Sequence, residues 1–199
     1  PAIDYYEDNG SATDKLRTYY YQGRIYQNAG NDTSAMEYFV NALSVGSQSN
    51  DILTKARIHF AQSNIYYDLY DFDNFIESNK SAALYFKQAE EYDSYAFCLI
   101  RIINGYTLKD EHDKALPYIE ECKLMLDGLN ITILTDFYST YITYLIRYGT
   151  EQEIDEIIHQ YISSIPSPNI DWLTIANAYY TMHKYNEALS ILSQYDTEG

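Results

Sequence analysis

The chain has 199 residues, of which 46% are hydrophobic and 21% charged, so it is long and apolar enough to bury a substantial core. Its net charge of −16 at pH 7 repels phosphate backbones and anionic lipid surfaces, which argues against nucleic-acid binding by this segment. Four prolines and eight glycines favour long helices over a β-sandwich, and no apolar run approaches the length of a membrane span, so no direct membrane insertion is expected.

The chain begins at Pro1 without Met, and residues 2–9 are followed by Asn9-Gly10-Ser11. This pattern predicts the end of a helix with a glycine stop, followed by Ser11 or Thr13 as the cap of the next helix. We interpret residues 2–9 as the second helix of a hairpin whose first helix is missing. The segment is therefore expected to be a piece of a longer protein.

Residues 19–42 carry large and small side chains in a fixed order: Tyr19, Gly23, Tyr26, Ala35, Phe39 and Ala42. The order predicts two antiparallel helices, in which the small residues let the helices approach and the aromatic residues fill the space between them. The same slots recur along the chain. The later sets are His59, Ser63, Tyr66, Phe75, Asn79 and Ala82; Leu99, Ile103, Tyr106, Ala115, Ile119 and Cys122; Tyr138, Ile142, Leu145, Ile154, Ile158 and Tyr161; and Trp172, Ala176, Tyr179, Ala188 and Leu192.

These slots resemble the signature of the tetratricopeptide (TPR) repeat family over roughly residues 15–195. The resemblance implies an all-α fold, a right-handed α-solenoid of about five helical hairpins. We expect one array over residues 1–199, with repeats at about 15–48, 56–90, 96–129, 135–168 and 169–197 and a remnant of a preceding helix at 1–10. The first periods reach 40 residues rather than 34, so the extra residues are expected between one hairpin and the next.

The tyrosine-rich block from Asp4 to Asn31 is similar to the sensor segments of bacterial, Bacteroidetes-type TPR regulatory proteins. This resemblance implies a signalling role, as the sensor or scaffold segment of a larger protein that is anchored outside the cytoplasm. A cytoplasmic location is the alternative. The alternative function is a helical accessory component of a nutrient-capture or enzyme complex.

We expect no enzyme, because the sequence has no GxGxxG, GxxxxGK[ST], HExxH or GxSxG motif. No catalytic, cofactor-binding or metal-binding residue is therefore predicted, and no cofactor. Glu156 and His159 have the Glu-x-x-His spacing of di-iron bundles, but no second copy accompanies them. Cys98 and Cys122 are expected to be small buried side chains, and a disulfide between them would require their helices to bring them close.

In a TPR array, the residues of each first helix that are not used for packing line a concave groove. This projection predicts a ligand site at Arg24, Asn64, Tyr67, Arg101 and Asn104, and it places Arg17, Arg57, Phe60 and Phe97 on the same face. The expected partner is a protein or an extended peptide, because Asn bonds a peptide backbone and Arg bonds a carboxylate. The alternative is that Arg17, Arg24 and Arg57 only pair with the acidic residues around them.

The carboxylate clamp of the family needs Lys at the fifth position of a repeat, and that position holds Tyr20, Phe60, Ile100, Ser139 or Leu173. Binding of chaperone tails is therefore not implied. At the two ends of the chain, residues 1–9 and the face of Leu189, Ile191 and Leu192 carry apolar side chains without a partner hairpin. We expect self-association through these terminal repeats, because terminal repeats normally need a polar outer face.

Overall fold

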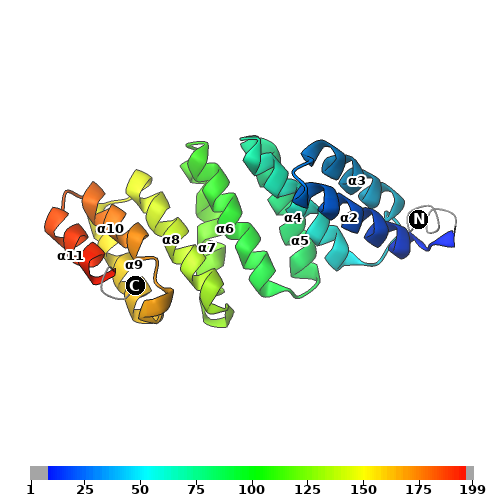
Figure 1. Cartoon of the computed structure of the whole chain (residues 1–199). Helices are drawn as coiled ribbons and strands as arrows, with labels where there is room; N and C mark the ends of the chain where they lie inside the picture. Colours follow the sequence, from blue (N-terminus) through cyan, green and yellow to red (C-terminus); the bar gives the residue numbers. More distant parts are fainter. Residues whose placement is uncertain (1–8, 196–199) are drawn as a thin grey trace. The chain divides into compact units, whose positions relative to one another are not determined.

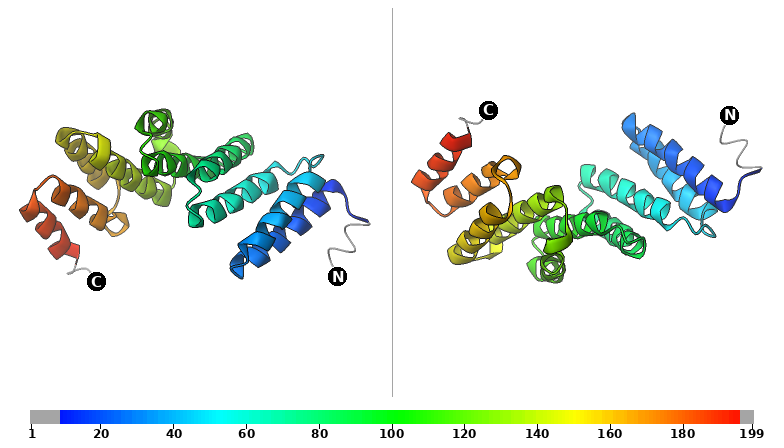
Figure 2. Two further views of the ribbon diagram at one scale, coloured as in Figure 1. Left: turned by 90° about the horizontal axis from the view of Figure 1, so that it is seen from above. Right: turned by 90° about the horizontal axis from the view of Figure 1, so that it is seen from below.

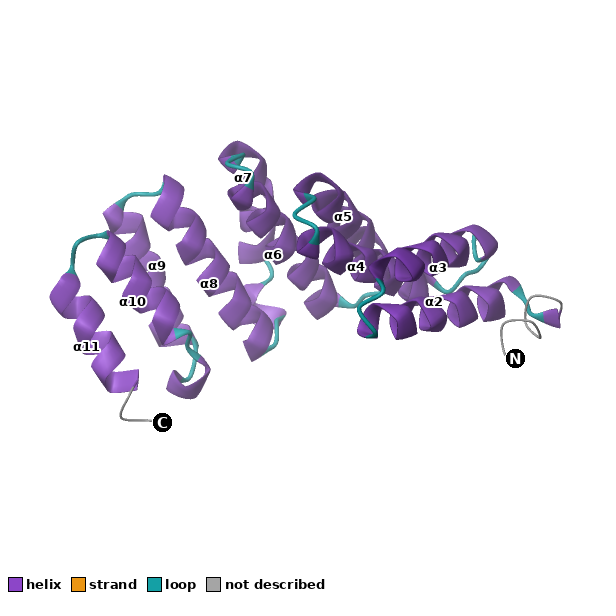
Figure 3. Ribbon diagram, turned by 45° about the horizontal axis from the view of Figure 1, so that its top comes forward, coloured by secondary structure: helices purple, strands orange, loops and turns teal. Residues whose placement is uncertain are grey.

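The computed structural model describes residues 9–195, and all regular elements in that range are helices (Figures 1 and 3). The helix expected over residues 2–9 lies, apart from Asn9, outside the described residues. The chain divides into two compact units, residues 1–98 and 99–199, and each is described here by itself. Whether the repeats form a single array across both units stays a prediction.

The first unit contains two helical hairpins and the start of a third. Its helices are α2 (Ala12–Asn28), α3 (Asp32–Val45), α4 (Ile52–Asp68), α5 (Phe72–Gln88) and the first part of α6 (Tyr92–Leu108). The two helices of the first hairpin, α2 and α3, lie side by side in both views of Figure 2. The residues that lengthen the repeat period lie in α4, α5 and α6, which have 17 residues each, and in the connection 46–51.

The second unit contains the rest of α6 and five further helices. They are α7 (His112–Lys123), α8 (Ile131–Tyr148), α9 (Glu151–Ser164), α10 (Trp172–Thr181) and α11 (Tyr185–Tyr195), with short 3-10 turns at Leu126–Gly128 and Ser167–Asn169. The helices pack as hairpins here too, with α8 against α9 and α10 against α11.

Side-chain caps fix where the helices begin. Ser11 caps α2: its Oγ accepts from the N–H of Asp14 at 3.2 Å, and the Asp14 carboxylate accepts from the N–H of Ser11 at 3.0 Å. This reciprocal arrangement is a capping box, and it identifies Ser11, rather than Thr13, as the cap. Six more side chains of the described residues accept from an N–H in the first turn of the following helix: Asn31, Asp51, Asp71, Asn130, Thr150 and Asp171.

The turns inside four of the hairpins share one backbone conformation, whereas Gly149 in the turn between α8 and α9 is extended, with φ −95°. The turn residues Gly30, Tyr70, Asp110 and His183 have φ angles of 73°, 58°, 61° and 60°. In each turn the next N–H donates to a carbonyl five residues back, as Asn31 does to Tyr26 and Asp71 does to Tyr66, both at 2.9 Å. This is the Schellman motif, which satisfies carbonyl groups at the end of the first helix.

Gly23 lets α2 and α3 approach closely, as the slot pattern predicts. A Cβ at this position would lie 2.5 Å from the Phe39 ring and 3.2 Å from the Ala35 carbonyl oxygen. In the second hairpin the equivalent residues are Ser63 and Asn79, both fully buried. Asn79 Nδ2 donates to the Phe75 carbonyl at 2.8 Å and Ser63 Oγ donates to the Phe60 carbonyl at 2.7 Å, and Ser63 Oγ also lies 3.4 Å from Asn79 Oδ1 across the two helices, so these buried polar side chains have hydrogen-bond partners.

Both cysteines are buried, Cys98 in the first unit and Cys122 in the second. Burial, together with the nearby Glu121 carboxylate, raises the pKa of the Cys122 thiol to about 12. The expectation that these residues act as small apolar side chains therefore agrees with their positions.

Candidate peptide-binding surface

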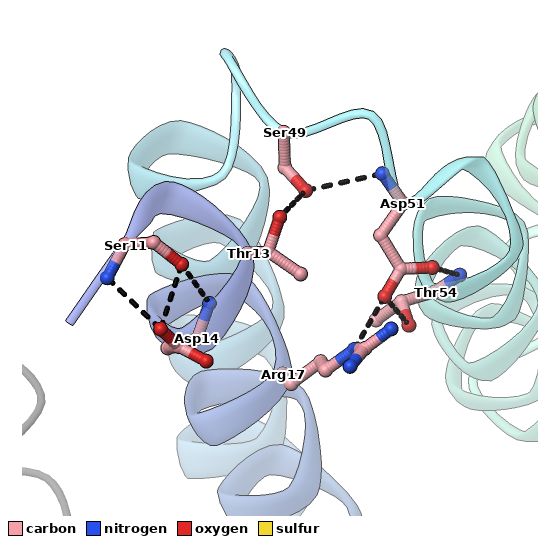
Figure 4. Close-up of polar contacts among 7 residues, drawn as sticks. All are labelled: Ser11, Thr13, Asp14, Arg17, Ser49, Asp51 and Thr54. Atoms are coloured by element: carbon pink, nitrogen blue, oxygen red, sulfur yellow. Dashed lines mark hydrogen bonds and ion pairs between the residues drawn. The ribbon is translucent and has the colours of Figure 1, made fainter.

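Polar residues of α2 and α4 in the first unit provide the candidate site, and three arginines decide its chemistry. Arg17 is engaged: its Nε donates to Asp51 Oδ2 at 2.5 Å (Figure 4). Asp51 also accepts from the N–H of Thr54 at 3.1 Å and from its hydroxyl at 2.9 Å. Partial burial acts to raise the pKa of Asp51, but the hydrogen bonds from Thr54 and Arg17 outweigh it, so this pKa lies below its ordinary value.

The connection before α4 supports this ion pair. The N–H of Asp51 donates to Ser49 Oγ at 3.1 Å, and Ser49 Oγ lies 2.8 Å from Thr13 Oγ1 of α2 (Figure 4). Ser49 is buried, so the connection is held against α2 rather than left in solvent. Arg17 is thus part of the structural contact between the first two hairpins, as the alternative interpretation of the arginines predicts.

Arg24 and Arg57 differ from Arg17. Within the described residues, neither arginine makes an ion pair. The Nε of Arg24 is also buried without a hydrogen-bond partner there, and so is Oε1 of Gln27, although Gln27 Nε2 donates to the Ala61 carbonyl at 2.9 Å. This part of α2 therefore presents one unused donor and one unused acceptor, each of which is costly to leave unpaired.

Arg57 lies at the edge of a cavity of about 330 Å³ within the first unit. Phe60 and Phe97 contact each other at a centroid distance of 5.8 Å and form part of its wall. The lining is completed by Leu53, Phe86, Glu91 and Ser94. Four of the seven lining residues are apolar and the others are Arg57, Glu91 and Ser94, so the cavity can hold an apolar side chain whose neighbouring carboxylate pairs with Arg57 in competition with Glu91.

Asn64 and Tyr67 lie farther along α4. Asn64 is half-buried, and its amide side chain makes no hydrogen bond within the described residues. Tyr67 is exposed, with its ring against Phe72 and Phe75 at centroid distances of 6.3 and 5.3 Å. The free amide can still pair with a peptide backbone, while the Tyr67 ring is held in place by its neighbours.

The remaining predicted site residues, Arg101 and Asn104, are half-buried on α6 in the second unit. A groove that continues from Arg24 to Asn104 therefore stays a prediction. The sequence projection places Arg57, Phe60 and Phe97 on this face without assigning them to the ligand site. Their recurrence at first-helix groove positions was the signal that could have included them.

A second hollow in the first unit, of about 600 Å³, lies between α3 and α4 and was not predicted. Exposed Val40 and Leu69 contribute to its lining, beside Asp32 and Glu37. It is larger than the Arg57 cavity but has no basic residue in its lining. We therefore place the candidate site at the arginines.

Other chemistry finds little support in the described part of the chain. No group of three or more His, Cys, Asp or Glu residues there is arranged to hold a metal ion. His59 stacks on Tyr85 at 5.8 Å, and burial lowers its pKa. No helix among the described residues is long and apolar enough to cross a membrane.

Comparison with known proteins identifies the fold. No protein-family model matches the chain, and no curated protein sequence matches it. The chain is similar in structure to a Podospora anserina protein, a candidate kinesin light chain with nearly identical TPR-like repeats solved by crystallography, with a TM-score of 0.69 and 16% identity over 90% of this chain and 92% of that one. The fold is TPR-like. The predicted all-α solenoid of helical hairpins is confirmed, whereas the Bacteroidetes-type subfamily stays a prediction.

Proposed function

We propose that this chain is a non-enzymatic protein-interaction module that binds an extended, acidic peptide segment on the α2 and α4 surface of its first unit. The TPR-like fold supports a role in protein–protein interaction. The observation that carries the choice of ligand is that Arg24 and Arg57 have no ion pair within the described residues, although the chain has 29 acidic and 13 basic residues.

The residues of this surface can each recognise a different chemical group of the peptide. Arg57 can bond a carboxylate bidentately, beside the cavity that Phe60 and Phe97 line for an apolar side chain. The half-buried guanidinium of Arg24, which makes no ion pair within the described residues, can donate to a second acceptor, and the Asn64 amide can pair with the peptide backbone. The net charge of −16 opposes an acidic ligand, so we expect micromolar affinity, a Kd of about 1–100 μM.

Binding of fluorescein-labelled seven-residue peptides, each with one Phe next to one Glu in a neutral background, tests this proposal by fluorescence anisotropy. We expect Arg57→Gln to weaken binding about tenfold or more, at an unchanged melting temperature. The matched control is Arg17→Gln, which removes the ion pair to Asp51 and should lower the melting temperature while leaving binding by the folded protein unchanged. Equal binding of peptides with Gln in place of Glu, or unchanged binding by Arg57→Gln, would contradict the proposal.

The wider role that we propose is that of a sensor or scaffold segment in a larger bacterial regulatory protein, anchored on the outer side of the cytoplasmic membrane. Its support is the tyrosine-rich block from Asp4 to Asn31, which resembles sensor segments of such proteins. Sequencing the coding region on both sides of this segment tests it. We expect a lipid-anchor cysteine upstream or a membrane-spanning helix downstream, and fusion to a cytoplasmic enzyme would contradict it.

A further inference from the structure

The last hairpin of the second unit presents an apolar face that the described residues leave open. A hollow of about 500 Å³ lies between α10 and α11, lined by Leu173, Ala176, Asn177, Tyr180, Tyr185, Ala188, Leu189 and Leu192. Leu173 and Leu189 are 70% and 64% exposed. We call this surface the α10/α11 face. Apart from the Asn177 amide, its lining residues present mainly apolar surface, and an exposed apolar surface of this kind marks a site of protein contact rather than a water-filled one.

A second open surface lies on α2 in the first unit. Tyr21 and Ile25, one helical turn apart, are 59% and 60% exposed. We call this pair the α2 face. Large side chains at this spacing form an apolar stripe on one side of a helix, which suits burial against another helical pair.

The interior of the first unit shows what such surfaces do when they are covered. In the repeat register, Ala61 and Ile65 of α4 are the equivalents of Tyr21 and Ile25, and they are 0% and 2% exposed in the core cluster that α2 and α3 share with α4. The first hairpin likewise has equivalents of the α10/α11 face, since Gln27 matches Tyr180 and Met36 matches Leu189.

One hydrogen bond joins the two sets of equivalent residues, and a second comes from Gln62, the neighbour of Ala61 in the chain. Gln27 Nε2 donates to the Ala61 carbonyl at 2.9 Å, and Gln62 Nε2 donates to the Met36 sulfur at 3.5 Å. In the repeat register, the α10/α11 face corresponds to the side of this contact that α2 and α3 provide, and the α2 face corresponds to the side that α4 provides.

The second unit contains a related contact with a polar component. Lys184, which follows α10, pairs with Asp155 of α9 at 2.6 Å, and Asp155 is the register equivalent of Leu189. The α10/α11 face thus carries leucine where a covered hairpin carries a carboxylate. Its hollow also has Ala176 and Ala188 in its lining, which leaves room for side chains as large as Tyr21 and Ile25.

We propose that a second copy of this chain docks its α2 face on the α10/α11 face. The two contacting surfaces differ, so the contact is heterologous. The inference is independent of the peptide-binding function, which uses other residues. Like charges on both copies oppose the contact, so it strengthens as salt screens them.

Sedimentation of the 199-residue chain over a range of concentrations tests the proposal. We expect the average mass to rise with concentration, and to rise further at about 0.5 M NaCl than at about 0.05 M. Ile25→Lys and Leu189→Lys should each abolish the rise, while the control Leu124→Lys, at an exposed leucine on neither face, should not. All three substitutions make the net charge less negative, so lost association cannot come from added repulsion. Because these side chains are exposed, circular dichroism and melting temperature should stay those of the unsubstituted chain.

Mixing the Ile25→Lys and Leu189→Lys variants tests whether the contact joins the α2 face of one copy to the α10/α11 face of another. Ile25→Lys keeps an intact α10/α11 face and Leu189→Lys keeps an intact α2 face, so the mixture should form a 1:1 dimer and nothing larger. Continued association of Ile25→Lys alone would show that two α10/α11 faces pair with each other and would overturn the proposal. A mixture that stays monomeric, or an unsubstituted chain that is monomeric at every concentration and salt, would overturn it as well.

Discussion

Individual residues in the turns carry a measurable backbone strain. Tyr70, Glu90, Asp110 and His183 all have positive φ, a region that costs a residue with a Cβ roughly 1–2 kcal/mol, whereas Gly30 adopts it without that cost. Repeated hydrogen bonds hold these turns in place, as when the N–H of Glu91 donates to the Phe86 carbonyl at 3.0 Å. The turn geometry is thus imposed by the helix ends rather than by glycine.

Glu90 offers the cleanest test of this strain, because its side chain is exposed and makes no hydrogen bond or ion pair within the described residues. We expect Glu90→Gly to raise the free energy of unfolding by about 0.5 kcal/mol, the relief of strain less the greater freedom of glycine in the unfolded chain. The reverse change, Gly30→Ala, should lower it by about 1 kcal/mol. Urea unfolding followed by circular dichroism measures both, and a loss of stability in Glu90→Gly would show that the turn is not strained.

At the scale of elements, Asp51 does more than cap α4. It accepts from Thr54 as an N-cap and also pairs with Arg17 of α2, so it joins two hairpins. Asp71 caps α5 with a similar bond to the N–H of Asn74 at 3.2 Å, and its second bond, from the Asn74 side chain, is local. A comparison of Asp51 with Asp71 therefore separates the stability contributed by a helix cap from that contributed by the contact between hairpins.

We expect Asp71→Ala to cost about 1 kcal/mol of unfolding free energy and Asp51→Ala about 2 kcal/mol, since the second also loses the Arg17 pair and the Thr54 hydroxyl bond. The pKa of Asp51 is lowered on folding, so its contribution is complete above the ordinary carboxyl pKa and disappears as pH falls through the lowered value. The difference between Asp51→Ala and the unsubstituted chain should accordingly shrink between pH 7 and pH 3. Urea unfolding at both pH values measures it, and equal costs for the two variants at pH 7 would rule out the contribution of Arg17.

Over the whole molecule, the excess of acidic residues works against folding. The described ion pairs, such as Lys80–Glu77 and Lys123–Glu120, are mostly exposed and worth less than about 1 kcal/mol each, whereas the net charge is −16. Repulsion should therefore outweigh the loss of these pairs when salt is added.

Raising NaCl from about 0.01 M to about 0.15 M shortens the Debye length from about 30 Å to about 8 Å, so we expect the melting temperature to rise by a few degrees. Calorimetry measures it. KCl should give the same rise, because screening does not depend on the identity of the cation. A melting temperature that falls with salt would mean that the ion pairs, rather than the net charge, dominate.

The sequence predicts the hairpins because Gly23, Ala35 and Phe39 have a fixed spacing that only helix packing explains. It does not predict positive φ at Tyr70, because a tyrosine does not mark the turn as Gly30 does in the first hairpin. For the site, Arg17 and Arg24 look alike in sequence. Arg17 meets a carboxylate 34 residues away, and this long-range contact depends on how the hairpins pack.

The alkylation rates of the two buried thiols can report local opening of the structure. A thiol whose pKa is raised to about 12 is almost never a thiolate at neutral pH, so Cys122 can react with an alkylating reagent only while its surroundings are open. The labelling rate of Cys122 then measures how often the packing around α7 breaks, while Cys98, buried in the other unit, serves as a separate clock for that unit. Single-cysteine variants would thus give the opening rate of each half of the chain from its native cysteine, without an engineered labelling site.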